Sequence, residues 1–159
     1  MNCKRIRLRS ILVPFCLLFL SPLAHAQKTD FAESPAYDVV DVIDGDTVKL
    51  MIDGRTTTVR LIGIDTPETV HPTKPVQPYG KHASEFLHNL LDGGSVFLEY
   101  GQERTDKYGR LLAYLYRAPD GMFVNLEIVR QGYGIAYTEY PFNYQELFVS
   151  WEKVARERS

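Results

Sequence analysis

The sequence predicts a mixed α and β domain, in which a small closed β-barrel carries helices packed on its outside. Three observations favour this fold class. Five short stretches with strand-like patterns are separated by Gly-containing turns, which is typical of a small barrel. Further stretches repeat apolar residues at helical spacing, so helices accompany the strands. The chain of 159 residues has the length of one domain.

The N-terminal residues 1–26 have the pattern of an export signal. An apolar run at 11–20 is too short to span a bilayer as a helix, and Ala24-His25-Ala26 offers an A-x-A cleavage site. The run follows four basic residues: Lys4, Arg5, Arg7 and Arg9. The alternative is an uncleaved membrane anchor. We expect an exported protein, periplasmic or extracellular, with no stable membrane association after cleavage.

The composition of the exported chain limits how it is held together and what it binds. Both cysteines, Cys3 and Cys16, lie in the signal, so packing alone stabilises the remaining 133 residues. Loss of the signal removes four of 18 basic residues and none of the 20 acidic ones, which leaves a formal charge of −6. This acidic balance argues against binding by broad attraction to phosphate. We expect a monomer in which any anionic substrate meets a local basic site.

The first half of the exported chain predicts an arm followed by three strands. Residues 27–36 are polar and contain a proline, so we expect a flexible N-terminal arm before a domain at 37–159. The predicted strands are 37–43, 46–52 and 56–64. Asp53-Gly54 between the second and third is a strong hairpin signal. Four prolines make 65–78 a loop.

The second half predicts two strands and three helices. The strands are 95–100 and 111–116, with a polar loop at 101–110 between them. Two helices are predicted at 79–91 and 124–131, where apolar residues recur at helical spacing. A last amphipathic helix is marked by Tyr144, Leu147, Phe148, Trp151 and Ala155.

Asp46 stands at the start of an apolar stripe. Side chains two apart in a strand share a face, so Asp46 shares one with Val48 and Leu50. A carboxylate that enters a core without a partner is costly, so Asp46 needs compensation or an open rim. The alternative is that Asp44-Gly45-Asp46 is only a turn, because both residue types favour turns.

Asp65 stands at the end of the apolar stripe of the third strand, and Asp46 stands at the start of the apolar stripe of the second strand. Pairing across the hairpin would place Asp46 and Asp65 at the same end of the barrel. Two carboxylates at such a short distance from each other need a cation between them, and oxygen ligands select Ca²⁺ or Mg²⁺. Glu68 follows in a turn stiffened by proline, where a carboxylate is able to position or deprotonate water. Solvated aspartates at strand ends are the alternative for Asp46 and Asp65, and a helix cap or a loop-surface position is the alternative for Glu68.

Cationic residues gather in the loop RTDKYGR at 104–110, and one lies inside a strand. The guanidinium of Arg110 offers a planar fork that fits phosphate oxygens. Arg60 interrupts the apolar third strand, and its position is out of phase with Asp65. A regular pleat therefore points Arg60 to the opposite face, and only a bulge or twist brings it to the rim. A surface Arg with its charge in solvent is the alternative.

Taken together, these motifs resemble the staphylococcal-nuclease-like thermonuclease family. The blocks that carry the resemblance are IDGDTVKL at 43–50, DTPET at 65–69, TDKYGR at 105–110 and VRQG at 129–132. The resemblance runs from about Val42 to the last helix, and it implies an OB-fold, a five-stranded barrel with three helices. It implies a secreted or periplasmic calcium-dependent nuclease that hydrolyses DNA and RNA. The alternative is a non-catalytic OB-fold module that binds nucleic acid or protein.

The resemblance also implies a role for each motif residue. One Ca²⁺ would be bound by the carboxylates of Asp46 and Asp65 and by the backbone carbonyl of Thr66, with Asp44 just outside. The implied catalytic residues are Arg60 and Arg110, which grip the scissile phosphate, and Glu68, which acts on the attacking water. The implied substrate-binding residues are Lys107 and Tyr108 at a neighbouring phosphate and Tyr137 against a base. The chain departs from the family pattern at Glu139, where a second tyrosine is expected, and Tyr140 follows it.

Overall fold

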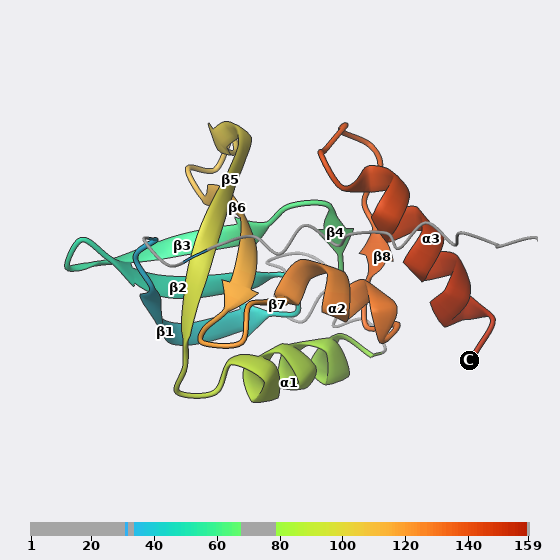
Figure 1. Ribbon diagram of the computed structural model, residues 1–159, viewed down its shortest axis with the longest axis horizontal. Coiled ribbons are helices and arrows are strands. Elements are labelled where there is room, and N and C mark those ends of the chain that lie inside the picture. Colours follow the sequence, from blue (N-terminus) through green and yellow to red (C-terminus); the bar gives the residue numbers. More distant parts are fainter. Residues whose placement is uncertain (1–30, 32–33, 68–78, 159) are drawn as a thin grey trace, which may run out of the picture.

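The computed structural model describes residues 31, 34–67 and 79–158, which form a β-barrel and three helices (Figure 1). The predicted signal at 1–26 and the catalytic candidate Glu68 lie outside the described residues. Of the predicted arm, residues 31 and 34–36 are described, and the ring of Phe31 stacks on Phe97 with the centroids 4.7 Å apart. The flexibility of the arm stays a prediction.

Five strands close into the barrel that the sequence predicts. They are β1 (Tyr37–Asp44), β2 (Thr47–Ile52), β3 (Arg55–Leu61), β5 (Ser95–Thr105) and β6 (Leu111–Arg117). Neighbours follow the order β3-β2-β1-β5-β6, and a parallel pairing of β3 with β6 closes the ring. Three two-residue strands complete the sheets: β4 (Ile64–Asp65), β7 (Met122–Phe123) and β8 (Ile135–Ala136). The closed barrel with helices outside confirms the predicted OB-fold class.

Three helices lie outside the barrel: α1 (Gly80–Leu91), α2 (Val124–Arg130) and α3 (Gln145–Arg156). Helix α1 packs against β1, α2 packs against β6 and α3, and α3 also contacts β8 (Figure 1). Leu87 of α1, Ile128 of α2 and Phe148 of α3 are fully buried, whereas Leu147 of the predicted stripe of α3 is 40% exposed. The predicted helices are confirmed to within a few residues. In the described part of the chain, no helix combines the length and apolar character needed to cross a membrane.

The predicted hairpin and its buried face are confirmed. Ile52 pairs with Arg55 across Asp53-Gly54, and both turn residues have positive φ, as a two-residue hairpin requires. Val48 and Leu50 are fully buried, and Asp46 next to them is only 5% exposed. The stripe argument therefore placed this carboxylate on the correct face of the barrel wall.

Two predicted strand boundaries are wrong. The second strand begins at Thr47 because Gly45 and Asp46 form the turn from β1, so the turn interpretation and the buried-face interpretation are both correct. Strand β5 continues to Thr105, where it pairs with Leu111, which shortens the predicted loop at 101–110. This part of β5 is held by backbone pairing with β6, while its polar side chains are not buried. The sequence there therefore carries no strand signal.

The predicted third strand is also wrong as one continuous element, because the chain turns at Ile62-Gly63 between β3 and β4. Gly63 has a φ of +78°, and a Cβ at this position would lie 2.5 Å from the ring of Phe142. The turn is held from the other side by Asn125, whose amide donates to the Ile62 carbonyl at 2.9 Å. Strand β4 then pairs with β8 instead of β2.

We predict that Gly63→Ala destabilises the protein more than Gly54→Ala. Both glycines have positive φ, at +78° and +74°, so both substitutions carry a backbone cost of about 1–2 kcal/mol. Only the Gly63 position meets a packed ring, whereas a Cβ at Gly54 meets nothing within 4 Å. Overpacking adds about 1–3 kcal/mol at Gly63.

Chemical denaturation of both variants and of the unmodified protein measures the difference in the free energy of unfolding. Equal destabilisation by the two substitutions would show that the Phe142 contact does not constrain the turn.

Candidate active site

The turn between β1 and β2 holds Asp46 at the rim of the barrel. The Asp46 backbone N–H donates to Asp44 Oδ1 at 3.1 Å, which fixes the turn. Gly45 lies so close to α1 that a Cβ here would be 2.8 Å from both Ala83 Cβ and Thr66 Oγ1. Only glycine fits at this short distance. The close contact brings Asp46 next to Thr66, which follows β4.

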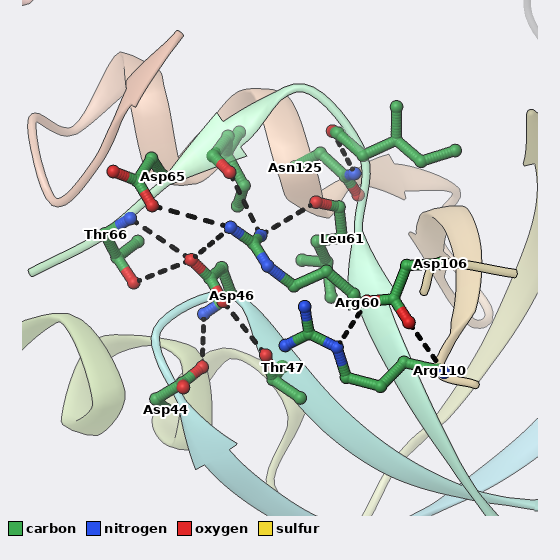
Figure 2. A network of polar contacts seen from close by, with 12 residues as sticks. Asp44, Asp46, Thr47, Arg60, Leu61, Asp65, Thr66, Asp106, Arg110 and Asn125 are labelled. Carbon is green, nitrogen blue, oxygen red and sulfur yellow. Dashed lines mark hydrogen bonds and ion pairs between the residues drawn. The ribbon is translucent and has the colours of Figure 1, made fainter. Parts of the chain in front are cut away.

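The buried carboxylate of Asp46 is surrounded by donors from three segments (Figure 2). The Thr47 hydroxyl donates to Oδ1 at 2.9 Å. The backbone N–H and hydroxyl of Thr66 both lie 3.2 Å from Oδ2, and Arg60 Nη2 is 3.0 Å from the same oxygen. Burial raises the pKa of Asp46 to about 7, while the Arg60 charge opposes the shift and Asp44 adds to it. The Arg60 charge and the Thr47 hydrogen bond therefore offset only part of the effect of burial on the pKa of Asp46.

Arg60 reaches the rim because β3 ends directly after it. Its Nη1 donates to the carbonyl oxygens of Leu61 and Ile64, both at 3.0 Å, so the guanidinium lies inside the turn that separates them. Its Nη2 lies between the carboxylates of Asp46, at 3.0 Å, and Asp65, at 3.5 Å. The bulge or twist that the sequence requires is thus the Ile62-Gly63 turn. Because the strand is interrupted there, the side chains of Arg60 and Asp65 no longer have to point to opposite faces.

Asp65 and Asp46 converge as predicted, but their environments differ. The Asp65 side chain is 49% exposed, whereas that of Asp46 is 8% exposed. Both carboxylates face one positively charged nitrogen of Arg60, so this rim already holds a cation between two oxygen ligands. In the part of the chain that the structure describes, no three His, Cys, Asp or Glu side chains are grouped to hold a metal ion. The carboxylate set is therefore a pair, with Glu68 outside the described residues.

Arg110 is positioned by Asp106, a residue to which the sequence interpretation gave no role. Asp106 Oδ2 accepts from Arg110 Nε at 2.7 Å, and its Oδ1 accepts the backbone N–H groups of Tyr108 and Arg110, each at 2.9 Å. Burial acts to raise the pKa of Asp106, but these hydrogen bonds, led by that from the Arg110 side chain, lower it overall. The available signal was an Asp four residues before an Arg in a turn that contains Gly109.

The parallel pairing of β3 with β6 brings the two arginines to one rim. Arg60 pairs with Leu112 in β6, and Arg110, directly before β6, stands two residues ahead of that partner. Residues two apart in an extended segment share a face, so the two arginines are brought to the same side. Figure 2 shows the guanidinium of Arg110 turned toward the Asp46–Thr47 turn. Two cationic forks and two carboxylates therefore meet although they come from segments 50 residues apart along the chain.

The predicted substrate-binding residues are linked to Arg110 and to the β3–β4 turn, and Lys107 and Tyr108 are exposed. Tyr108 is 73% exposed, and Lys107 Nζ and Arg110 Cζ lie 5.1 and 5.5 Å from its ring centroid. The Tyr137 N–H donates to the Gly63 carbonyl at 3.0 Å, which ties this tyrosine to the β3–β4 turn. Tyr108 and Lys107 thus lie beside Arg110, and Tyr137 lies beside the turn that holds Arg60.

Glu139 adds a contact that the sequence interpretation did not assign. The Tyr137 hydroxyl donates to the Glu139 carboxylate, and this hydrogen bond raises the pKa of Tyr137 to about 12. The ring of Tyr140 lies with its centroid 6.1 Å from that of Tyr137, so a second tyrosine is near the first despite the shifted spacing.

Comparison with known proteins gives consistent matches along this chain. The staphylococcal nuclease homologue family matches residues 58–159. A thermonuclease of Staphylococcus hyicus is 43% identical over 126 residues, which cover 79% of this chain and 73% of that protein. A thermonuclease of Staphylococcus intermedius is 47% identical over 125 residues, covering 77% and 73%. Endonuclease YncB of Bacillus subtilis is 45% identical over 101 residues, covering 62% and 47%.

The family match contains Arg60, Asp65 and Arg110 of the rim, and the resemblance drawn from the motifs is confirmed. Identity above 40% over most of both proteins accompanies the closed barrel with three outer helices. The chain belongs to the staphylococcal nuclease homologue family.

Proposed function

We propose that this protein is an exported, calcium-dependent nuclease that hydrolyses phosphodiester bonds of DNA and RNA. Membership of the family and similarity to proteins named thermonuclease and endonuclease support a hydrolytic phosphodiesterase. The observation that carries the proposal is the convergence of Asp46 and Asp65 on one positive charge at a rim that also holds Arg110. The exported location rests on the predicted signal at 1–26, and the protein acts as a monomer.

The donor set at this rim fits a hard divalent cation. Arg60 Nη2 marks a position where a positive charge lies between the oxygens of Asp46 and Asp65. Carboxylate oxygens with a backbone carbonyl are the ligands that Ca²⁺ prefers. Asp46, Asp65 and the carbonyl of Thr66 would hold the ion, with waters completing its shell. When bound, the ion supplies positive charge that polarises the phosphodiester and helps to activate water.

The two arginines supply the charge stabilisation that hydrolysis of a phosphodiester needs. In the transition state the phosphorus carries an extra oxygen and additional negative charge. Arg110 is anchored through Nε, which leaves its two terminal nitrogens for phosphate oxygens, whereas Arg60 is anchored through Nη1 and its Nη2 faces Asp46 and Asp65 at the rim. Donors that are fixed before the reaction act without a reorganisation cost. Glu68 is proposed to orient or deprotonate the attacking water.

Lys107, Tyr108 and Tyr137 bind the rest of the substrate. Lys107 and Tyr108 are proposed to contact a terminal or neighbouring phosphate, and the exposure of Tyr108 makes it accessible. Tyr137 is proposed to pack against a base, a contact that tolerates any sequence because every base offers a π-face. In this arrangement the base is contacted only by packing, and such weak base contacts suit hydrolysis of both DNA and RNA.

Incubation of the purified protein with plasmid DNA and with RNA, in Ca²⁺ or in chelator, tests the proposed function. We expect cleavage of both substrates in Ca²⁺ and none in chelator. Binding of nucleic acid without cleavage in either condition would support the alternative, a non-catalytic OB-fold module.

We predict that Arg110→Lys and Lys107→Ala affect different kinetic constants. Arg110→Lys keeps the charge but loses the fork and the Nε bond to Asp106, so kcat falls roughly a hundredfold or more. Lys107→Ala removes a point charge that binds substrate in the ground state, so KM rises while kcat stays near normal. Steady-state kinetics on a short single-stranded oligonucleotide, at saturating Ca²⁺ and fixed salt, measure both.

If Arg110 and Lys107 acted only by general electrostatic attraction, the two positions would be of similar importance for activity. Near-normal kcat in Arg110→Lys, with turnover abolished in Lys107→Ala, would reverse the proposed roles.

We predict that Ca²⁺ raises the melting temperature of the protein without nucleic acid present. A ligand at about 100 Kd that binds only the native state adds about 2.7 kcal/mol. For a domain of this size, the gain corresponds to an increase in Tm of about 5–10 °C. Asp65→Asn should lose most of the shift, whereas the matched change Asp92→Asn, at an exposed position beyond α1, should keep it.

Thermal melts with millimolar Ca²⁺ and with chelator measure these shifts. Identical midpoints for the unmodified protein in the two conditions would contradict a native-state calcium site.

A further inference from the structure

We propose that Arg60 occupies the cation position when no metal is bound, so that a divalent cation binds Asp46 and Asp65 only by displacing the guanidinium. This inference rests on the proposed calcium site. It assigns Arg60 a second role, as an internal competitor that sets the cation affinity, in addition to its contact with phosphate.

The acceptor capacity of Asp46 is already in use. An ionised carboxylate oxygen offers about two lone-pair positions. Oδ2 of Asp46 receives three donors: Arg60 Nη2 at 3.0 Å and the N–H and hydroxyl of Thr66, both at 3.2 Å. Oδ1 receives the Thr47 hydroxyl at 2.9 Å. A cation that ligates Asp46 through Oδ2 therefore has to remove a donor.

Among these donors, Arg60 is the one that a cation expels. Its Nη2 carries positive charge, so a divalent ion at the same carboxylates repels it, and low exposure at this rim weakens solvent screening. The two threonines are neutral, and both are buried beside the turn that holds Asp46. Their hydroxyls and the Thr66 N–H remain compatible with a carboxylate that also ligates a metal.

The anchoring of Arg60 permits a small displacement. Nη1 is bound to the Leu61 and Ile64 carbonyls, and these bonds involve neither carboxylate. Nη2 is thus able to leave Asp46 while the guanidinium stays at the rim. Asp65 is 49% exposed on its side chain, so the ion enters from solvent on that side. The released Nη2 donors then face the same opening as the substrate.

Arg110 provides a matched comparison for this role. It is an arginine at the same rim, but its Nε is paired with Asp106 at 2.7 Å. The structure gives it no ion pair with Asp46 or Asp65. Arg60→Gln and Arg110→Gln therefore each remove one positive charge near the cation site. Only Arg60→Gln also removes the contact that competes with the cation for Asp46 and Asp65.

Isothermal titration of Ca²⁺ into the nucleic-acid-free protein tests the inference. We expect the Kd for Ca²⁺ to fall about tenfold or more in Arg60→Gln, because a charge in direct contact with the ligands is removed. In Arg110→Gln we expect a change within about threefold, since that charge is compensated by its own partner. Circular dichroism establishes that both variants are folded before titration.

A second measurement uses the unmodified protein and does not depend on a folded Arg60 variant. Nitrogen-edited NMR of the arginine side chains follows each guanidinium during the Ca²⁺ titration. We expect the Arg60 signals to shift on saturation as Nη2 leaves the carboxylates, and the Arg110 signals to stay in place.

Unchanged Arg60 signals, or a Kd that is equal or weaker in folded Arg60→Gln, would overturn the inference while the proposed calcium site survives. Absence of Ca²⁺ binding to the unmodified protein and to both variants would overturn the calcium site and the inference together.

Discussion

The buried charge of Asp46 is the constraint on which the arrangement of the rim depends. A carboxylate that is 5% exposed needs donors, and they come from separate segments: Thr47 in β2, Arg60 at the end of β3 and Thr66 after β4. Arg60 and Thr66 reach it only because the chain turns at Ile62-Gly63 between them. The location of this one charge therefore links the β1–β2 turn to the end of β3, and Gly45 allows the close approach.

A second feature of the rim is that each arginine is held by carboxylates. Arg60 is shared between Asp46 and Asp65, and Arg110 is bound by Asp106. Ion pairs in which one partner is buried contribute more to fixing a geometry than to net stability, because removal of either partner leaves an uncompensated charge. Side chains that are already fixed lose little conformational entropy on meeting a phosphate. The acidic residues of this rim thus serve as supports for its cations.

The sequence was sufficient for the barrel and its outer helices, because these follow from apolar periodicity and one hairpin signal. It also predicted the convergence of Asp46 with Asp65, but from a continuous third strand that the Ile62-Gly63 turn divides. It did not place Arg60, since its phase relative to Asp65 depends on a turn at Gly63 that is fixed by Phe142, 79 residues later in the chain. The extension of β5 to Thr105 escaped detection because its side chains face solvent and carry no apolar pattern. Asp106 was missed as a support for Arg110 because a short-range Asp–Arg pair in a polar loop is usually a surface contact.

The charges at the rim would connect the proposed cation binding with the proposed substrate binding. Four carboxylates, those of Asp44, Asp46, Asp65 and Asp106, and two guanidiniums, those of Arg60 and Arg110, give a formal charge of −2 (Figure 2). A phosphodiester that approaches this rim therefore meets net repulsion, and the predicted exported chain, at −6, supplies no compensating long-range attraction. One divalent cation brings the same six groups to neutrality. If that cation also releases Nη2 of Arg60 from Asp46, it both removes the repulsion and adds a free donor at the position where the phosphate arrives. Affinity for a polyanion would then arise at the rim itself, with no need for a basic surface.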